Sequence, residues 1–268
     1  MGFAPSKARG QNFLVHEHVI DAILRLVQPG EQDRILEVGP GLGFVTRRLI
    51  GAERRVWAVE VDSRLVQWLG DGPLGSHAGF QLVHDDVLKI DFDGFLPDGK
   101  IKVVANLPYS VAAPVLLRLF EEGRRFSLLV VMLQKEVARR LTAAPGTPSY
   151  GALSVWSRLY GRVTERVPVA PEAFTPKPKV DSTLLRIELL DPPALPPAEI
   201  PGLRAVVRAG FGQRRKMLGN ALAGLFGSTA EAVFETAAVD PRRRAETLNL
   251  DEFGRLARAF RDAREAVR

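Results

Sequence analysis

The chain contains no cysteine among its 268 residues, which excludes disulfides, thiolate metal sites and a cysteine nucleophile. That absence suits a reducing compartment, and the cytoplasm is the expected location. Four histidines, of which His16 and His18 are the only close pair, do not predict a metal site. The longest strongly apolar run, Leu128–Leu133, is too short to cross a bilayer, and the N-terminus lacks the apolar core of a signal peptide. No membrane partner is therefore expected.

Acidic residues are in deficit, with 31 Asp plus Glu against 37 Lys plus Arg, a net charge of +6. Residues 195–268 hold 13 basic and 9 acidic side chains and so carry +4 of that excess. A basic balance favours a polyanionic partner. Arg214, Arg215 and Lys216, and a second run at Arg242–Arg244, could follow an RNA backbone. Solvated helix ends would have the same composition, so both interpretations stay open.

Short β-rich apolar runs alternate with helical stretches over the first two-thirds of the chain, which predicts an α/β fold with a doubly wound parallel sheet. The expected strands are Arg34–Val38, Arg55–Val61, Phe80–Val83, Ile101–Ala105 and Ser127–Leu133. Two later runs, Leu153–Tyr160 and Thr183–Leu189, would complete seven strands. The expected helices between strands are Phe44–Ile50, Ser63–Leu69 and Pro114–Glu121.

A proline-rich stretch at 191–198 predicts a linker between a domain at 1–190, which includes an N-terminal helical arm, and a small all-helical domain at 199–268. Apolar residues in the second domain recur at intervals of three and four. The helices expected there are Gly202–Gly210, Arg214–Leu225, Thr229–Ala238 and Leu250–Ala266.

A glycine-rich turn, Glu37-Val-Gly-Pro-Gly-Leu-Gly43, lies between an expected strand and an expected helix. Glycines at 39, 41 and 43 let the backbone turn sharply and approach a ligand closely. Glu60 ends the next strand, where a carboxylate can accept both hydroxyls of a ribose, and Asp86 follows the third strand, where it can accept from an adenine amine. These positions meet at one edge of the sheet, so they predict a nucleoside site.

The nucleoside is expected to be S-adenosylmethionine, with S-adenosylhomocysteine as the product, and not a dinucleotide. A dinucleotide fingerprint would have a small residue at position 44, where this chain has Phe44. Glu37 would also repel a pyrophosphate. A sulfonium cation is instead favoured by the charges of Glu37, Glu60 and Asp86.

Asn106-Leu-Pro-Tyr109 follows the fourth expected strand directly and indicates the chemistry. The exocyclic nitrogen of adenine is a poor nucleophile, because its lone pair is delocalised into the ring. The side-chain oxygen of Asn106 and a backbone carbonyl of Leu107 or Pro108 can accept its hydrogens and favour a freer lone pair. Tyr109 offers a face on which a splayed base stacks, worth roughly 1–3 kcal/mol. The expected catalysis is alignment of nitrogen, methyl carbon and sulfur.

Six motifs taken together resemble the KsgA family of small-subunit ribosomal RNA adenine dimethyltransferases. They are Gly10-Gln-Asn-Phe-Leu14, Glu37–Gly43, Asn106–Tyr109, Gln134-Lys-Glu-Val137, Phe174-Thr-Pro-Lys-Pro-Lys-Val-Asp-Ser182 and Phe211-Gly-Gln-Arg-Arg-Lys216. The resemblance implies a Rossmann-like class I methyltransferase domain of seven strands with a small helical C-terminal domain. It implies transfer of four methyl groups to two adjacent adenosines near the 3′ end of 16S rRNA, within the immature 30S subunit, by an enzyme expected to be monomeric.

The resemblance also implies roles for individual residues. Asn12 and Leu14 would line the cofactor site from an N-terminal helix. Gly39 would contact the methionine part, Glu60 the ribose and Asp86 the adenine. Asn106 would touch both cofactor and target amine, and Phe174, in a loop after the sixth strand, would be the second aromatic residue of the target pocket.

Two other readings remain open. An adenine methyltransferase of 23S rRNA or of DNA would share the same site, and the helical extension with Phe211–Lys216 argues against it by resemblance. A non-catalytic assembly factor could use the fold to hold immature ribosomal subunits. RNA binding alone does not require Glu60, Asp86 or the Asn106–Tyr109 motif. Their presence therefore favours an enzyme over a non-catalytic assembly factor.

Overall fold

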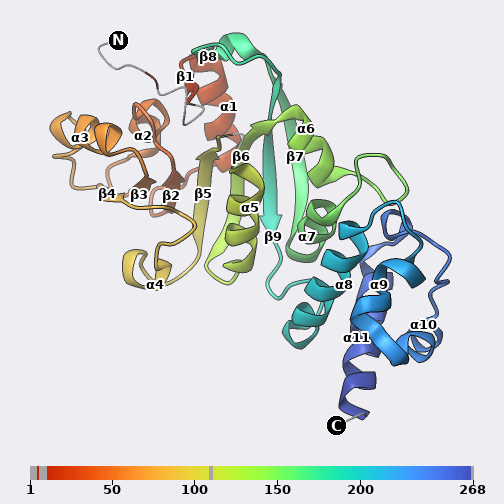
Figure 1. Ribbon diagram of the computed structural model, residues 1–268. Coiled ribbons are helices and arrows are strands. Elements are labelled where there is room, and N and C mark those ends of the chain that lie inside the picture. The colour runs from red at the N-terminus through yellow and green to blue at the C-terminus, as the bar shows by residue number, and fades with distance from the viewer. Residues whose placement is uncertain (1–4, 6–10, 109–110, 267–268) are drawn as a thin grey trace. The chain divides into compact units, whose positions relative to one another are not determined.

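The computed structural model describes residues 5, 11–108 and 111–266 (Figure 1). The contacts of the chain divide it into two compact units. The sheet unit comprises residues 1–138 and 162–189, and the helical unit comprises residues 139–161 and 190–268. The chain therefore passes from the first unit to the second, returns, and passes over again.

A seven-stranded sheet in the order β4-β3-β2-β5-β6-β9-β7 forms the sheet unit. Strands β2 to β6 pair in parallel, and β9 runs antiparallel to β6. Successive strands move outward from β2 to β4, and the chain then crosses back to β5 beside β2. This reversal is the point at which open α/β sheets bind their ligands. The strands are β2 (Arg34–Val38), β3 (Arg55–Glu60), β4 (Phe80–His84), β5 (Ile101–Asn106), β6 (Phe126–Gln134), β7 (Gly161–Val169) and β9 (Ser182–Leu189).

Both faces of the sheet are covered, as a parallel sheet requires. Ile35 and Leu36 point to opposite faces because they are neighbours in β2, yet both are fully buried. Ile35 shares a core with Ile20 and Ile23 of α1, and α5 crosses the face of the sheet turned to the viewer in Figure 1. The helices are α1 (Glu17–Val27), α2 (Phe44–Leu49), α3 (Ser63–Asp71), α4 (Phe92–Phe95), α5 (Ala112–Glu121) and α6 (Lys135–Thr142), which leads into the helical unit.

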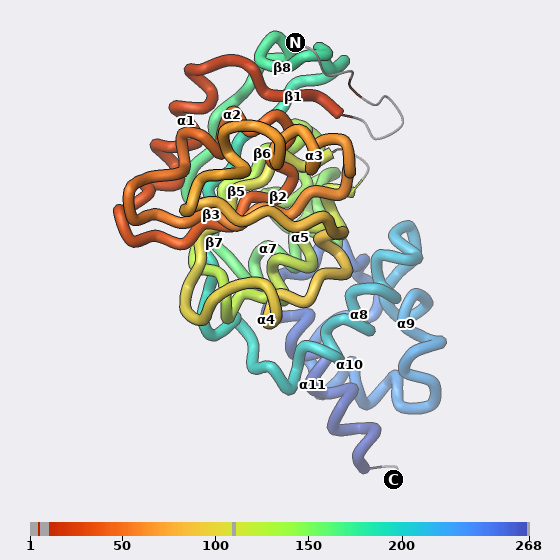
Figure 2. Tube along the Cα trace, turned by 90° about the vertical axis from the view of Figure 1, so that its left-hand side faces the viewer, coloured from red at the N-terminus to blue at the C-terminus, as the bar shows by residue number. Residues whose placement is uncertain are grey.

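A separate two-stranded ribbon joins segments that are far apart in the sequence. Strand β1 (Phe13–Leu14) pairs antiparallel with β8 (Phe174–Thr175), so that Leu14 lies opposite Phe174. The amide of Val15 extends the pairing by donating to the carbonyl of Ala173. Figure 2 shows the two segments side by side at one end of the sheet unit. This ribbon holds the N-terminal segment against the main sheet.

The helical unit has a core rich in aromatic side chains. Phe211 packs between Tyr150 and Phe253, with tilted rings whose centroids are 6.0 and 5.8 Å away. The fully buried Tyr150 hydroxyl donates to the carbonyl of Leu248 at 2.7 Å. The α-helices of this unit are α7 (Ala152–Tyr160), α8 (Ile200–Gly212), α9 (Leu218–Phe226), α10 (Ala230–Ala237) and α11 (Leu250–Ala266). Short 3₁₀ turns in the chain are at Pro171–Ala173, Pro197–Glu199, Gly227–Thr229 and Ala245–Thr247.

Two of the expected elements are wrong. The run Leu153–Tyr160 is not a strand: it lies in helix α7, and the strand is its successor β7. The helix expected at Arg214–Leu225 begins only at Leu218, because the chain between α8 and α9 forms a turn that contains Arg214, Arg215 and Lys216.

The division of the chain differs from the expected boundaries in two respects. Residues 139–161 group with the C-terminal helices and not with the sheet. The proline-rich stretch at 191–198 also belongs to the helical unit, where buried Leu195 lies directly against Gly254 of α11. No helix among the described residues has both the length and the apolar character to cross a membrane.

Candidate active site

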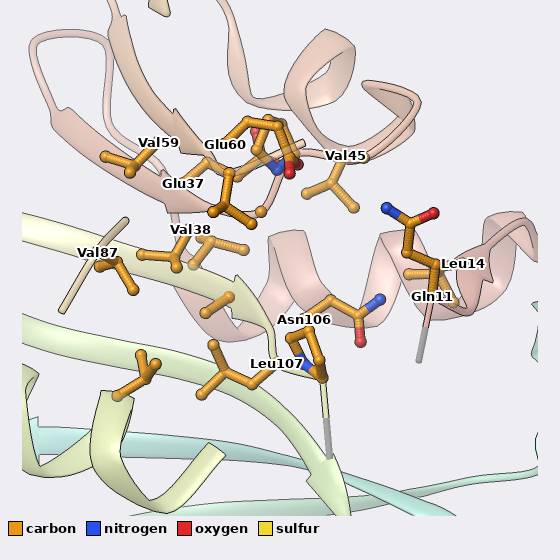
Figure 3. Close-up of a pocket in the computed structure, with 18 of the residues that line it drawn as sticks. Gln11, Leu14, Glu37, Val38, Val45, Val59, Glu60, Val87, Asn106 and Leu107 are labelled. Atoms are coloured by element: carbon orange, nitrogen blue, oxygen red, sulfur yellow. The ribbon is translucent and has the colours of Figure 1, made fainter. Parts of the chain in front are cut away.

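A pocket of about 290 Å³ opens where the sheet reverses its order, between the carboxyl ends of β2 and β5. Its walls also include the ends of β3 and β4, the N-terminal segment and Phe174 of β8. The volume lies near the lower end of the range for small-molecule sites, roughly 300–1,000 Å³. Figure 3 shows Glu37, Glu60 and Asn106 among the side chains that line it. All lining residues belong to the sheet unit.

The turn after β2 forms the floor of this pocket. Gly39, Gly41 and Gly43 have φ angles of 71°, 56° and 79°, a region that favours glycine. The amide of Gly39 donates to the carbonyl of Val59 at 2.9 Å and ties the turn to β3. A Cβ on Gly39 would meet only the carbonyl of Asn106 at 4.0 Å, so the space above it is open to a ligand.

Gly43 has a different role from the one expected. It does not line the pocket but precedes the first residue of α2. A Cβ there would lie 2.6 Å from a methyl of Leu74 and 2.9 Å from a methyl of Leu69. Close packing of α2 against the chain around α3 therefore requires this glycine, whereas Gly39 and Gly41 face the pocket.

Glu37 lies at the end of β2 and is almost completely buried. The hydroxyl of Thr46 donates to its Oε2 at 2.6 Å. Burial raises the pKa of Glu37 to about 7, the Thr46 hydrogen bond opposes that rise, and the nearby charge of Glu60 adds to it. Glu37 is therefore an acid that changes charge near neutral pH in the absence of a cation.

Glu60, at the end of β3, is also buried but has more hydrogen-bond donors. Burial raises its pKa, while backbone amides of Asp62, Gly41 and Val61 favour the charged form. The Asp62 amide donates to Glu60 Oε1 at 2.9 Å. The carboxylate is thus fixed at the strand end, where the sequence predicts a ribose contact.

The far wall of the pocket is mostly apolar, with Val61 and Leu65 after β3 and Val87 and Leu88 after β4. Asp86 also lines it and accepts the amide of Leu88 through Oδ1 at 3.0 Å, which fixes the turn after the strand. Apolar walls with carboxylates at the edge, here Asp86 and its neighbour Asp85, suit a planar, amine-bearing base such as adenine.

Asn106 is the last residue of β5 and points into the pocket (Figure 3). Its Nδ2 donates to the carbonyl of Asn12 at 3.3 Å, which leaves Oδ1 as the atom that can accept from a ligand. Leu107 and Pro108 continue the pocket wall. Tyr109 lies outside the described residues. The three described residues of the motif are therefore together at the site.

The N-terminal segment contributes residues 11–14 to the lining of the pocket. The expectation that Asn12 and Leu14 lie in a helix is wrong, since Leu14 is in strand β1 and helix α1 begins only at Glu17. Pairing with β8 takes the backbone hydrogen bonds that a helix would have made.

Phe174 also lies in a strand, β8, and not in a loop. It is 4% exposed, lines the pocket, and packs in the same core as Leu14 and Ala173. Phe174 thus forms part of the pocket wall, and its packing in the core also holds strand β8 in place.

Sequence reasoning missed four residues that shape the site: Gln11, Phe13, Thr46 and Asp62. Gln11 Nε2 donates to Asp62 Oδ2 at 2.9 Å, and the Phe13 ring packs on Gly41. Asp62 could have been found, because an acidic residue directly before an expected helix is a capping signal. Its side chain accepts the amide of Arg64 in the first turn of α3.

The three candidate RNA-binding residues lie together on the surface of the helical unit. Arg214, Arg215 and Lys216 are exposed in the turn between α8 and α9. Arg214 Nε pairs with Glu246 at 2.7 Å, and its Nη2 donates to the carbonyl of Pro148. In the second run, Arg242 pairs with Asp240 and Arg243 with Glu252. The turn at 214–216 is therefore the less neutralised of the two.

Metal-binding side chains do not gather elsewhere in the described part of the chain. His16 and His18 lie with their Nδ1 atoms 3.2 Å apart on the surface, and no group of three or more His, Cys, Asp or Glu is placed to hold an ion there.

Residues 3–262 match the model of a family described as ribosomal RNA adenine dimethylase. The Ribosomal RNA small subunit methyltransferase A of Clostridium acetobutylicum is 40% identical over 258 residues, which cover 95% of this chain and 93% of that protein. The protein of the same name from Clostridium perfringens is 41% identical over 263 residues, or 96% and 91% of the two chains.

Solved structures show the same fold at lower identity. A dimethyladenosine transferase from Plasmodium falciparum has a TM-score of 0.77 and 22% identity, and the match covers 93% of this chain and 98% of that one. The 23S rRNA methyltransferase ErmE has a TM-score of 0.67 and 24% identity, with 93% and 100% covered. The fold is thus a Rossmann-like methyltransferase sheet accompanied by C-terminal helices.

Proposed function

Since the chain belongs to the ribosomal RNA adenine dimethylase family, we propose that it dimethylates the exocyclic amines of two adjacent adenosines in the 3′-terminal hairpin of 16S rRNA. Relatives at about 40% identity carry the name of a small-subunit methyltransferase, which supports this substrate over 23S rRNA or DNA. The observation that carries the proposal is Asn106 at the end of β5, with its amide nitrogen held by Asn12 and its oxygen available to an amine.

S-adenosylmethionine is the methyl donor, and it supplies a methyl carbon activated by a sulfonium sulfur. The residues present fit it. Glu60 offers a fixed carboxylate for two ribose hydroxyls, and the turn at Gly39 leaves open space that a Cβ would narrow. The apolar wall at Val61 and Val87 suits an adenine face, with Asp86 at its edge. A buried acid at Glu37 favours a cationic ligand.

Asn106 acts on the target base in this proposal. Its Oδ1 accepts one hydrogen of the adenine amine, and a backbone carbonyl of Leu107 or Pro108 accepts the other. The two acceptors favour a pyramidal nitrogen whose lone pair is free to attack. The pocket supplies alignment, so no strong base is needed, because an alkylated ammonium loses its proton to water.

Phe174 and Tyr109 provide the aromatic faces for a base splayed from the RNA, a step typical of enzymes that modify bases. The exposed turn at Arg214, Arg215 and Lys216 binds the phosphate backbone. The expected substrate is 16S rRNA within the immature 30S subunit in the cytoplasm, and the enzyme acts as a monomer. The domain at 1–190 performs the chemistry, and the helices of 199–268 contact the ribosome.

The proposal is tested by incubating the protein and S-adenosylmethionine with 30S subunits that lack these methyl groups, and in parallel with 23S rRNA and with DNA. Mass mapping should find dimethyladenosine at two adjacent positions of the small-subunit RNA. Methylation confined to 23S rRNA or to DNA would show that this nucleic acid, and not 16S rRNA, is the substrate. Binding to 30S subunits without any methyl transfer would support the assembly-factor reading instead.

A further inference from the structure

Residues 11–14 form a strap that lines the cofactor pocket and is held at both of its ends. At the target side, Leu14 pairs with Phe174 and the carbonyl of Asn12 accepts from Asn106. At the cofactor side, Gln11 Nε2 donates to Asp62 Oδ2 at 2.9 Å. Both Gln11 and Leu14 face the pocket in Figure 3. The strap therefore spans from the end of β3 to β8.

Asp62 links this strap to the carboxylate assigned to the ribose. Its backbone amide donates to Glu60 Oε1, and its side chain is only 2% exposed. The same carboxylate accepts Nη2 of Arg64 at 2.7 Å and caps the first turn of α3. These donors hold the pKa of Asp62 well below its usual range, so its side chain is a charged acceptor at neutral pH. Of the two polar ends of the Gln11 amide, only the NH₂ group can donate to it.

Packing reinforces the observed position of the strap. Phe13 is 8% exposed and forms a small apolar cluster with Leu42 and Leu65. A Cβ on Gly41 would lie 3.1 Å from its ring, so the ring rests directly on the glycine turn. With the strap in place, Glu37 and Glu60 are both about 5% exposed or less. A nucleoside bound at these acids would therefore lie in the same pocket as the strap.

We propose that Gln11 and Asp62 are positioning residues whose hydrogen bond closes the strap over the pocket and sets how long the cofactor stays bound. The inference rests on the proposed function, in which dimethylation of two adenosines consumes four cofactor molecules. Each transfer is followed by exchange of S-adenosylhomocysteine for a new donor. The hydrogen bond between Gln11 and Asp62 thus balances retention of the cofactor during each transfer against release of the product between transfers.

The key variant is Gln11→Glu, which places a second carboxylate against Asp62 and turns the attraction into repulsion. We expect S-adenosylhomocysteine to bind about tenfold more weakly, mostly through faster dissociation. Titration calorimetry gives the affinity, and chase of radiolabelled S-adenosylmethionine with unlabelled ligand gives the dissociation rate. Gln11→Ala removes the donor without adding charge and should give a smaller change in the same direction.

The double variant Gln11→Glu with Asp62→Asn reverses donor and acceptor and keeps the hydrogen bond. An asparagine at position 62 still caps α3, because asparagine is as good an N-cap as aspartate. Affinity and dissociation rate should return to within about threefold of the wild-type values, a coupling that a merely structural role would not produce. Gln32→Glu is the matched control, since it makes the same change at an exposed turn away from the pocket.

Thermal unfolding without cofactor checks that each variant is folded. If Gln11→Glu binds S-adenosylhomocysteine with wild-type affinity, the proposed role of the Gln11–Asp62 hydrogen bond is wrong. It is also wrong if the double variant binds this ligand as weakly as Gln11→Glu does. A wild-type protein that binds neither S-adenosylmethionine nor S-adenosylhomocysteine would instead overturn the proposed function. The two failures are therefore distinct.

Discussion

Glu37 and Glu60 lie near the carboxyl ends of neighbouring strands and are buried to a similar degree. Their hydrogen-bond partners nevertheless stabilise the ionised carboxylate to different extents. Glu60 accepts several backbone amides, which stabilise its ionised form. Glu37 instead accepts the side-chain hydroxyl of Thr46. A buried carboxylate with fewer donors is costlier to ionise, so Glu37 takes a proton at a higher pH than usual. The difference in donors thus makes Glu37 the acid whose charge changes near neutral pH, while backbone amides oppose the rise in the pKa of Glu60.

Replacing Glu37 by Gln should stabilise the cofactor-free protein by a margin that grows as pH rises. The folded protein holds the Glu37 proton up to a pH of about 7, whereas the unfolded chain releases it near the ordinary value of 4.5. Wild-type stability therefore falls between those pH values, and the Glu37→Gln variant escapes this loss, which is at most about 3 kcal/mol. Urea unfolding at pH 5, 6, 7 and 8 measures the margin.

At pH 5 the margin should be only about 1 kcal/mol, because this pH lies half a unit above the ordinary value of 4.5 and the glutamine keeps the acceptor for Thr46. Other ionisable groups are present in both proteins and largely cancel from the difference. A margin of the same size at every pH would show that Glu37 ionises normally in the folded state.

Asn106→Ala should reduce methyl transfer by about 100-fold or more, because it removes the acceptor that orients the target amine. RNA binding should stay nearly intact, since most of its contacts are to phosphates. Cofactor affinity should fall only slightly, with Glu60 and Asp86 in place. Single-turnover transfer, filter binding of RNA and calorimetry separate these effects. If the Asn106→Ala variant transfers methyl groups at the wild-type rate, Asn106 has no role in the reaction.

At the level of elements, the parallel strands were predicted to within about a residue at each end, because each is a short apolar run between turn residues. Helix α7 resembles a strand in the sequence for a physical reason. No residue of the helix is fully exposed, and even Ser154 and Ser157 are buried beside Val155 and Trp156, so a solvent-exposed polar face does not reveal its period. Edge strand β7 was missed because most of its side chains are exposed and polar.

The site could be predicted where motifs follow strand ends, which the order of a parallel sheet brings together. Asn12, Leu14, Glu37, Gly39, Gly41, Glu60, Asp86, Asn106 and Phe174 all line one pocket. Gln11 and Asp62 could not be paired from sequence, because 51 residues separate them and neither lies in a regular pattern. Pairing of β1 with β8 depends likewise on a contact between distant segments.

The glycine turn gives a test at this scale. Gly39→Ala and Gly43→Ala both force a side chain into a left-handed backbone, at about 1–2 kcal/mol. Gly43→Ala also drives its Cβ against Leu69 and Leu74, whose buried methyls have little room to move, and adds about 1–3 kcal/mol. Urea unfolding without cofactor should therefore find Gly43→Ala the less stable. If both variants lose the same free energy of unfolding, Leu69 and Leu74 move aside for the new Cβ without cost.

For the whole molecule, the excess of positive charge predicts RNA affinity that falls steeply with salt. Arg215→Gln with Lys216→Gln should flatten the slope of log affinity against log salt by up to about 2, since each phosphate contact contributes roughly 0.7–0.9. Arg214→Gln should flatten it less, because Arg214 already pairs with Glu246. Filter binding from low to high salt measures the slopes.

Arg242→Gln serves as the control for charge alone, because Arg242 is exposed and paired with Asp240. Its slope should match the wild type. If the Arg215 and Lys216 variant also keeps the wild-type slope, the turn at 214–216 faces solvent in the complex and other residues bind the phosphates.

The helical unit is assembled from two stretches of chain, and translation releases them at different times. Helix α7 leaves the ribosome before β7, β8 and β9, whereas Leu248, which accepts the Tyr150 hydroxyl, follows Tyr150 by 98 residues. At typical elongation rates that interval lasts about 5–20 s. All of the pocket-lining residues have emerged by then, because the last of them is Leu184. The nascent protein therefore completes the chain that lines its candidate active site while the Tyr150 hydroxyl still awaits Leu248.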